Sequence, residues 1–554
     1  MKHNITKYIA ALLAAALLPA GAAQGGGTEA HWGADALEQA AEQGWMKPEE
    51  TADGPDLAMT RGGFVSALWR MDGAPAGAES PFADLPEDSA LSGALGWAFA
   101  AGIAAGTDGR TFAPEAPLSR EDAAVLMFRY LDQKDRLSIG DASVNPPADA
   151  GTVSGYAEAA AARLWRLGIF RGGENGAFLP QTPLSRAEAA ALLTRLKSLT
   201  GQRVTERLTI PSFDAYPLEG KLDLPAGQEA DKLVVFVNGS GPNTYDNRRE
   251  INGISFRYYD LFAEQLTRRG TAFFRASTRG VYPSEAAPMF AEVHDAEYRT
   301  YLPETSVQDI EAIVAALKAD PRLKNARVYL LGWSEGTMTA PKVAQRGNVQ
   351  VDALLLAGYC NGTMDEALEW QQSGASSMLL YSQYFDYDGD GAVSEAEFAE
   401  DRYQLKDQLG SDFTALDADG NGALTIDDFA MLTAPFRREM LDAIKGRDDQ
   451  WLKENYSVQL TSGWFLAHRA FQPNREMLAA LDLPIHIFHG TADLNVSVQG
   501  VYDIESTFQN LGKTNLTLHV FPGMDHDLNY LVYPLTGGIP ESFTDLFQTI
   551  AALD

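Results

Sequence analysis

The segment RVYLLGWSEG, residues 327–336, places a serine at the point where a buried strand gives way to a helix. Its first residues are almost all apolar, and Gly332, Ser334 and Gly336 fit the pattern Gly-x-Ser-x-Gly. In a tight turn between strand and helix, small flanking residues let the serine hydroxyl project above the edge of the sheet. The five-residue pattern occurs by chance, but behind a buried strand it predicts a nucleophile. The alternative is an N-cap serine at a glycine-rich helix start.

Further short apolar runs lie on both sides of this segment, from about Arg203 onward, and helical patterns such as SVQDIEAIVAALKAD separate them. Buried strands that alternate with helices are typical of a mostly parallel sheet covered on both faces. We therefore expect one α/β domain over residues 203–554. The expected strands are Leu233–Gly239, Thr271–Thr278, Arg327–Ser334, Val351–Gly358, Pro484–Gly490 and Leu516–Gly523.

Two later strands are each followed by a residue that can complete a catalytic triad. Asp493 follows the run PIHIFHG, and His526 follows LTLHVFPG. The order serine, acid, histidine, with each group after a strand, is what such a sheet needs, because the carboxyl ends of parallel strands meet at one edge. The histidine would take the serine proton, and the acid would orient the imidazole. The other histidines lie within strands, in an insertion or before the nucleophile, and we interpret them as structural.

Two backbone N–H groups are expected to stabilise the negative oxygen of the reaction intermediate. One is that of Glu335, directly after the nucleophile. The second is expected in the turn NGSGPNTYDNR after an earlier strand, from Ser240, with Gly239 giving access to the backbone.

This part of the chain resembles the α/β-hydrolase carboxylesterases and related serine acyl hydrolases, with Asn238 and Trp333 where that family often has histidines. The resemblance implies hydrolysis of an acyl bond, most simply a carboxylic ester of a small molecule, through a serine acyl-enzyme and without an organic cofactor. A serine peptidase or amidase remains an alternative, because the same triad serves both reactions. A non-catalytic surface scaffold is a second alternative.

An insertion over residues 362–478 is expected to form a helical cap on the α/β domain. It contains the stretches DYDGDGAVSEAE, residues 386–397, and DADGNGALTIDD, residues 417–428. Both match the EF-hand calcium loop, with glycine at the sixth position for the sharp turn. Phe385, Phe398, Leu416 and Phe429 flank the loops as helix anchors. The expected metal ligands are Asp386, Asp388, Asp390, Ala392, Ser394, Glu397, Asp417, Asp419, Asn421, Ala423, Thr425 and Asp428.

The calcium ions are expected to have a structural role. Residues 386–428 carry thirteen acidic side chains and only two basic ones, so two divalent cations would remove much of the self-repulsion. The second loop ends in Asp428 where the pattern has glutamate, and this shorter side chain favours weaker calcium binding or admits magnesium.

The first two hundred residues repeat one pattern in three segments, which we place at residues 28–78, 79–140 and 141–200. Each segment ends in a Ser/Thr-Arg motif that opens a helix, and Arg61, Arg120 and Arg186 recur at an interval of about 60 residues. Thr60, Ser119 and Ser185 stand where helix N-caps are expected.

These segments resemble S-layer homology domains, through LSREDA, LSRAEA and their Gly-x-x-x-Gly-x-x-x-x-Phe-x-Pro lead-ins. The first copy departs from the pattern, since MTRGGF lacks the acidic residue. The resemblance implies an all-α bundle that binds secondary cell-wall polysaccharide of Gram-positive-type walls, with the three arginines pairing with ligand carboxylates. The alternative for these arginines is a solvated charge at a helix start.

The N-terminus predicts a secretory signal peptide over residues 1–23, because two lysines precede an apolar run that ends in small residues. The run is too short for a transmembrane anchor, so we expect a secreted protein associated with the cell wall or S-layer. A net charge of −31 over 554 residues argues against nucleic-acid binding. Cys360 is the only cysteine, so an intramolecular disulfide is excluded, and we interpret it as a core residue.

Overall fold

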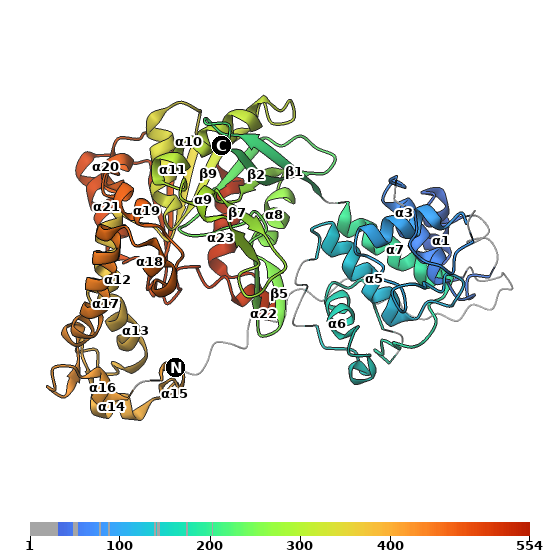
Figure 1. Ribbon diagram of the computed structural model, residues 1–554, viewed down its shortest axis with the longest axis horizontal. Helices are drawn as coiled ribbons and strands as arrows, with labels where there is room; N and C mark the ends of the chain where they lie inside the picture. The colour runs from blue at the N-terminus through green and yellow to red at the C-terminus, as the bar shows by residue number, and fades with distance from the viewer. Residues whose placement is uncertain are drawn as a thin grey trace, which may run out of the picture.

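The computed structural model describes residues 31–47, 54–76, 79–86, 89–137, 140, 144–172, 175–201, 203–410 and 412–553. The predicted signal peptide lies outside these ranges. The described chain forms two bodies, a helical bundle over residues 31–201 and a larger sheet domain from residue 203 onward (Figure 1). A slender extension projects from the sheet domain and carries α13 and α14 near its tip.

The helical bundle is held together by a cycle of backbone hydrogen bonds between the residues that precede its Ser/Thr-Arg motifs. The Met59 N–H donates to the Leu184 carbonyl, the Leu184 N–H to Leu118, and the Leu118 N–H to Met59. Each motif therefore contacts the other two. The helices are α1 (Ala34–Glu42), α3 (Arg61–Met71), α4 (Ser92–Ala100), α5 (Arg120–Gln133), α6 (Glu158–Arg166) and α7 (Arg186–Thr200), with a 3₁₀ turn at Ala150–Thr152.

The predicted helix starts in the bundle are confirmed. The Thr60 hydroxyl accepts from the Gly63 N–H, Ser119 from Asp122, and Ser185 from Glu188. Such N-caps satisfy backbone donors that have no partner inside the helix.

The sheet domain is built on an eight-stranded sheet in the order β1-β2-β6-β3-β9-β10-β13-β14. The strand β2 runs antiparallel to both neighbours, and the six strands from β6 to β14 are mutually parallel. This order, with a serine in the turn after β9, is the α/β-hydrolase fold that the sequence predicted. The strands are β1 (Arg203–Pro211), β2 (Pro217–Pro225), β3 (Lys232–Val237), β6 (Thr271–Ala276), β9 (Arg327–Trp333), β10 (Ala353–Ala357), β13 (Ile485–Gly490) and β14 (Leu516–Phe521).

Helices cover both faces of this sheet. One face packs against α8 (Asp260–Thr267) and α23 (Glu541–Ala552) through an aromatic core that includes Phe236, Phe262 and Phe543. The other face packs against α10 (Pro303–Ala319), α11 (Gly336–Arg346) and α21 (Gln499–Leu511). The α10 helix begins three residues before the predicted pattern, because Pro303 sits in its first turn, where a missing N–H costs nothing.

The segment between β10 and β13, called the insertion below, is almost entirely helical. Its first and last helices join the main core of the sheet domain. Its middle part has a separate core that contains the four predicted anchors, Phe385, Phe398, Leu416 and Phe429. Its elements are α12 (Met364–Gln372), α13 (Ala375–Phe385), β11 (Val393–Ser394), α14 (Glu395–Glu400), α15 (Lys406–Leu409), α16 (Phe413–Leu416), β12 (Ala423–Leu424), α17 (Ile426–Gly446), α18 (Asp449–Asn455), α19 (Ser462–His468) and α20 (Asn474–Ala479).

Shorter elements complete the sheet domain. Two hairpins lie beside the carboxyl edge of the sheet, and short helices fill the remaining connections. These elements are β4 (Arg248–Ile251), β5 (Ile254–Arg257), β7 (Val281–Pro283), β8 (Ala291–Val293), α9 (Asp295–Tyr298) and α22 (Val532–Thr536).

The junction between the two bodies is rich in buried charge. The Lys221 ammonium on β2 is fully buried and contacts the Asp135 carboxylate of the bundle at 2.7 Å. The Arg136 guanidinium donates to the Thr205 hydroxyl at 2.7 Å, and Arg257 pairs with Asp132 at 2.8 Å. Because breaking the buried Lys221–Asp135 pair would leave an uncompensated charge, this contact opposes separation of the bundle from the sheet domain.

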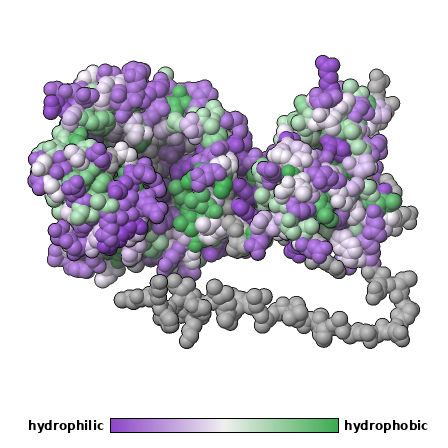
Figure 2. All heavy atoms as spheres, turned by 90° about the horizontal axis from the view of Figure 1, so that it is seen from below, coloured by the Kyte–Doolittle hydropathy of each residue, from purple (hydrophilic) through white to green (hydrophobic). Residues whose placement is uncertain are grey.

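The surface seen in Figure 2 is mostly hydrophilic, in keeping with the excess of acidic residues. Among the described residues, we find no helix with the length and apolar character needed to cross a bilayer.

Candidate active site

Ser334 lies in a strained turn between β9 and α11. Its φ angle is 55°, in the left-handed region that side chains other than glycine seldom adopt. The two flanking positions have no room for a side chain, so both must be glycine. A Cβ atom on Gly332 would lie 2.4 Å from the Gly336 carbonyl oxygen, and one on Gly336 would lie 2.1 Å from that of Val237. The local sequence thus forces the backbone into the turn that exposes the serine, and such strain is typical of functional sites.

The predicted acid and histidine are in contact. The His526 Nδ1 atom lies 2.7 Å from the Asp493 carboxylate, which is fully buried. The other oxygen of Asp493 accepts from the backbone N–H groups of Asn495 and Val496 at 2.8 and 2.9 Å. Burial raises the pKa of Asp493, but the His526 charge and these hydrogen bonds hold it below its ordinary value. The acid is therefore charged and oriented towards the imidazole.

The nearby His489 has the structural role that the sequence suggested. Its side chain is fully buried, its Nδ1 atom accepts from the Tyr359 N–H at 3.0 Å, and Nε2 lies 3.1 Å from the Val496 carbonyl oxygen. Burial lowers the pKa of His489, which favours the neutral ring. His489 thus supports the loop of the acid, and His526 remains the histidine that faces the serine cavity.

The residues predicted to bind the reaction oxyanion surround Ser334. A Cβ atom on Gly239 would lie 3.0 Å from the Ser334 Cβ atom and 3.8 Å from its hydroxyl oxygen. The backbone N–H groups of Ser240 and Glu335 donate no hydrogen bond to another group in the described part of the chain. Two such donors beside Ser334 fit the predicted oxyanion site.

One feature of the site was missed by the sequence analysis, namely the buried side chain of Glu335. Its carboxylate accepts from the Trp464 indole N–H at 3.0 Å and lies 2.8 Å from the His468 Nε2 atom. The Tyr301 hydroxyl is a third partner. Trp464 and His468 belong to α19 of the insertion, so the residue directly after Ser334 connects the insertion to the sheet domain. No local pattern could predict this cluster, because its members are far apart in the sequence.

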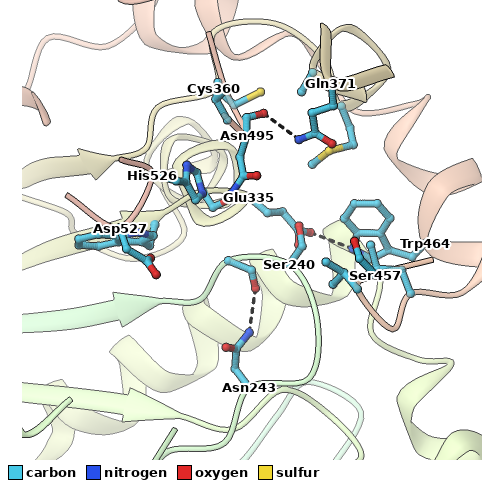
Figure 3. Close-up of a pocket in the computed structure, with 18 of the residues that line it drawn as sticks. Ser240, Asn243, Glu335, Cys360, Gln371, Ser457, Trp464, Asn495, His526 and Asp527 are labelled. Atoms are coloured by element: carbon cyan, nitrogen blue, oxygen red, sulfur yellow. Dashed lines mark hydrogen bonds between the residues drawn. The ribbon is translucent and has the colours of Figure 1, made fainter. Parts of the chain in front are cut away.

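These groups line one cavity of about 270 Å³ (Figure 3). Ser334, Ser240, Glu335 and His526 line it, together with residues of the insertion such as Met364. Cys360 also lines the cavity, but burial raises the pKa of its thiol to about 12, so its thiolate is not populated at neutral pH. Ser334, the predicted nucleophile, lines the same cavity.

The two predicted calcium loops each bring carboxylates together. Ligand oxygens of Asp386, Asp388 and Asp390 all lie within 4.8 Å of one another, and so do those of Asp417, Asp419 and Asp428. The glycine at the sixth position has a φ of 90° in the first loop and 87° in the second. The strands β11 and β12 pair the two loops side by side. Clustered hard oxygen donors in this arrangement fit calcium.

The loops differ at their last position. Glu397 is not part of the first carboxylate group, and its side chain caps α14, where it accepts from the Ser394 N–H at 2.9 Å. Asp428 does belong to the second group, and it is fully buried. Weaker calcium binding by the second loop, or its occupation by magnesium, stays a prediction.

The three arginines of the bundle lie at the start of their helices. The Arg61 guanidinium pairs with Asp122 of the following segment at 2.9 Å, and Arg120 pairs with Glu188 at 2.5 Å. Arg120 is buried and also lies over the rings of Phe170 and Phe178. Arg61 and Arg120 thus link successive segments, and their binding to a wall polymer remains a prediction.

Comparisons with known proteins match both bodies in part. A family model for the S-layer homology domain matches residues 81–124 and 148–190. The esterase EstD of Thermotoga maritima is 31% identical over 169 residues, which are 30% of this chain and 36% of the esterase. An amylopullulanase of Thermoanaerobacterium thermosulfurigenes is 26% identical over 176 residues, 31% of this chain and 9% of that protein. The chain therefore spans little more than a third of the length of the first relative and a tenth or less of the second.

Solved structures with a similar fold include a thermostable carboxyl esterase from Bacillus coagulans. It is 13% identical, with a TM-score of 0.37, and the match covers 63% of this chain and 99% of that one.

Proposed function

We propose that this protein is a serine hydrolase that cleaves a carboxylic ester and acts at the cell surface. The observation that carries the proposal is the 2.7 Å contact of His526 with buried Asp493, in a cavity shared with the strained Ser334. The partial similarity to an esterase supports the same reaction class.

In the proposed mechanism, the His526 imidazole takes the proton of Ser334 as the hydroxyl attacks the ester carbonyl carbon. The Ser240 and Glu335 N–H groups stabilise the negative oxygen of the tetrahedral intermediate. The imidazolium then gives its proton to the leaving alcohol, and an acyl-enzyme remains. Water activated by His526 releases the acid in the second half of the reaction.

A peptidase or amidase activity uses the same groups, and a scaffold without turnover would keep the fold alone. The experiment that separates these functions is turnover of p-nitrophenyl esters beside peptide p-nitroanilides, together with labelling by a fluorophosphonate. Ester turnover and labelling support the proposal. Faster anilide turnover would favour a peptidase, and the absence of both turnover and labelling would favour the scaffold.

The pH dependence of kcat/KM is expected to report His526. Burial by itself lowers the pKa of His526, but the charge and hydrogen bond of Asp493 raise it above 6.5. Because the base must be neutral to accept the serine proton, activity should be low below this raised pKa and should rise as pH passes through it. We expect a midpoint above 6.5, which moves down in Asp493→Asn. A wild-type midpoint at or below 6.5 would contradict this prediction.

We further propose that residues 28–78, 79–140 and 141–200 are three S-layer homology repeats that bind secondary cell-wall polysaccharide. The family model matches parts of the second and third segments, which supports this proposal. The backbone hydrogen bonds that join Met59, Leu118 and Leu184 support it as well, because each of the three motifs takes the same part in them. The expected ligand residues are Arg61, Arg120 and Arg186. A predicted signal peptide at residues 1–23 would deliver the protein to the wall.

Replacing Arg120 and Arg186 together by methionine is expected to weaken binding of the full chain to purified cell walls by about tenfold or more, the effect of losing hydrogen bonds with a charged partner. Cosedimentation measures this. Arg110→Met, at an exposed arginine of the same body, serves as the matched control. Thermal unfolding is followed in parallel because Arg120 is buried. Undiminished binding of the folded double variant would remove these arginines from the ligand site.

We also propose that the two loops at residues 386–397 and 417–428 each hold Ca²⁺. The carboxylate groups of each loop would provide most of the ligands, with the backbone carbonyl oxygens of Ala392 and Ala423 at the seventh position. Bound calcium would neutralise part of the negative charge on this segment, and its role would be structural.

A further inference from the structure

The cavity around Ser334 has two chemically different sides. In the proposed reaction, His526 must pass a proton to the leaving-group oxygen, so the leaving group lies on the His526 side of the serine. Figure 3 shows Asp527 beside His526, and Trp464 and Ser457 on the opposite side of Glu335. The inference below rests on the proposed ester hydrolysis and concerns what each side binds.

The insertion supplies Trp464 and Ser457 on the side opposite His526 (Figure 3), and most of its other lining residues are apolar. These include Met364 and Leu368 of α12 and Val458 and Leu460 of the segment before α19. Met364, Leu368 and Leu460 are each less than a tenth exposed. A wall of this kind favours the acyl chain of an ester over a polar group, because burial of a hydroxyl without a partner costs free energy.

The side next to His526 carries an ion pair that the triad does not use. The Arg249 Nη1 atom, on the β4 strand, lies 3.4 Å from the Asp527 carboxylate. Both side chains remain about a third exposed, at 36% and 35%. The guanidinium also stacks over the Tyr258 ring, 4.4 Å from its centre. Burial lowers the pKa of Arg249, but Asp527 and the nearby tyrosines raise it above the ordinary value, so the arginine is charged.

Arg249 is held in a fixed position relative to the reacting serine by a chain of hydrogen bonds. Its Nε atom donates to the Asn247 side-chain oxygen at 3.1 Å, and the Asn247 amide donates to that of Asn243 at 3.4 Å. The Asn243 amide donates in turn to the Gly239 carbonyl at 3.1 Å, in the loop of the proposed oxyanion donors. This placement is preorganised for a group bonded to the ester carbonyl.

The pair presents donors and an acceptor side by side. The Arg249 Nη2 atom has no hydrogen-bond partner among the described residues, and the Asp527 carboxylate accepts only the long contact from Arg249. The carboxylates of Asp525 and Asp527 leave no excess of positive charge beside Arg249. A substrate that carries a carboxylate or phosphate here would therefore be repelled by Asp527. Adjacent hydroxyl groups, each a donor and an acceptor, match this surface.

We propose that Arg249 and Asp527 form a leaving-group subsite that binds the adjacent hydroxyls of a polyol or saccharide. The substrate class is then an ester between an apolar acyl group, bound by the insertion, and a polyhydroxylated alcohol. The subsite discriminates between alcohols, because a bound alcohol without these hydroxyls displaces water from the donors and the acceptor and gives them no hydrogen bond in return.

The test compares esters with one acyl group and different alcohols, namely glycerol monobutyrate and ethyl butyrate. We measure the ratio of their kcat/KM values for the wild type, Arg249→Met and Asp527→Asn. Each variant should lower the glycerol-to-ethyl ratio by about 10- to 100-fold, the range for hydrogen bonds with a charged partner. Arg248→Met is the matched control, because the Arg248 guanidinium pairs with Glu285 and does not line the cavity. It should keep the wild-type ratio.

A second measurement needs only the wild type, so it stands if a variant fails to fold. Methyl glucopyranoside should inhibit ethyl butyrate hydrolysis competitively at concentrations at which cyclohexanol does not. Equal ratios in the wild type and both variants, or an equal change in Arg248→Met, would overturn the subsite. Equal inhibition by the two alcohols would overturn it as well. If the wild type hydrolyses neither ester, the proposed function itself fails.

Discussion

Replacing Ser334 with alanine is expected to lower ester hydrolysis by about 10⁴- to 10⁶-fold, because members of a triad act as a unit and little remains when one is removed. The protein should stay folded. Alanine occupies the same space, and the φ of 55° at this position is as unfavourable for alanine as it is for serine. His526→Ala should have an effect of similar size.

The loss is measured with p-nitrophenyl esters, and a fluorophosphonate identifies the nucleophile directly. The cavity holds two further serines, Ser240 and Ser457, so Ser457→Ala is a matched control that should still be labelled. Equal melting temperatures for the wild type and Ser334→Ala exclude unfolding as the cause. Near-normal turnover in folded Ser334→Ala would show that Ser334 is not the nucleophile.

The sequence predicted the parallel part of the sheet well, because its strands are continuous apolar runs. All six predicted strands are present, with no end shifted by more than two residues. The two strands at one end of the sheet, β1 and β2, were not predicted. Their residues alternate between buried and exposed only loosely, and they form a long antiparallel pair whose register runs from Arg203 with Pro225 to Pro211 with Pro217. Such pairing is set by neighbouring strands and a turn, and not by hydrophobic runs.

The candidate site also has some features that the sequence predicted and others that it did not. Ser334, Asp493 and His526 could be found because each follows a buried strand, and the fold brings those strand ends together. The contacts of the Glu335 carboxylate with Trp464 and His468 join residues about 130 positions apart. The chain from Arg249 to Gly239 depends on a hairpin that the sequence analysis did not identify. Features of this kind depend on tertiary packing, for which one sequence carries no periodic signal.

Helices of the insertion connect the predicted calcium loops to the candidate active site. The helix α12 lines the cavity through Met364 and Leu368, and α13 leads directly from it into the first loop. The second loop opens α17, whose Met440 and Ile444 join the main core together with α12. The loops are thus connected to the acyl side of the cavity by two helices, and not to the triad itself.

Removal of calcium is therefore expected to lower the melting temperature and to reduce activity only in part. Binding to the folded state alone stabilises it by about 2.7 kcal/mol when the ion is at 100 times its Kd. For a domain of this size, 1 kcal/mol corresponds to about 2–4 °C, so 10 mM calcium against chelator should shift the transition by about 5 °C or more. The triad contains no metal ligand, so the loss of activity should follow disorder of the α12 wall. This loss of activity should appear mainly as a higher KM for esters with longer acyl chains.

A double variant and a control distinguish the effect of bound metal on stability from the effect of the loops' own hydrogen bonds. Asp386→Asn with Asp417→Asn removes two negative charges and keeps one acceptor oxygen in each side chain. Two loop N–H groups bond to separate oxygens of Asp386, at 2.7 and 3.1 Å, so one of them retains its acceptor and the other loses it. In chelator this variant should be close to the wild type in stability, because the fall in self-repulsion offsets the lost hydrogen bond. In calcium it should gain little, because each site has lost a ligand charge. Glu395→Gln, at an exposed residue of α14 outside the expected ligand set, should keep the full calcium response. If chelation leaves the wild-type transition unchanged and elemental analysis finds no calcium, the loops are acidic turns and not metal sites.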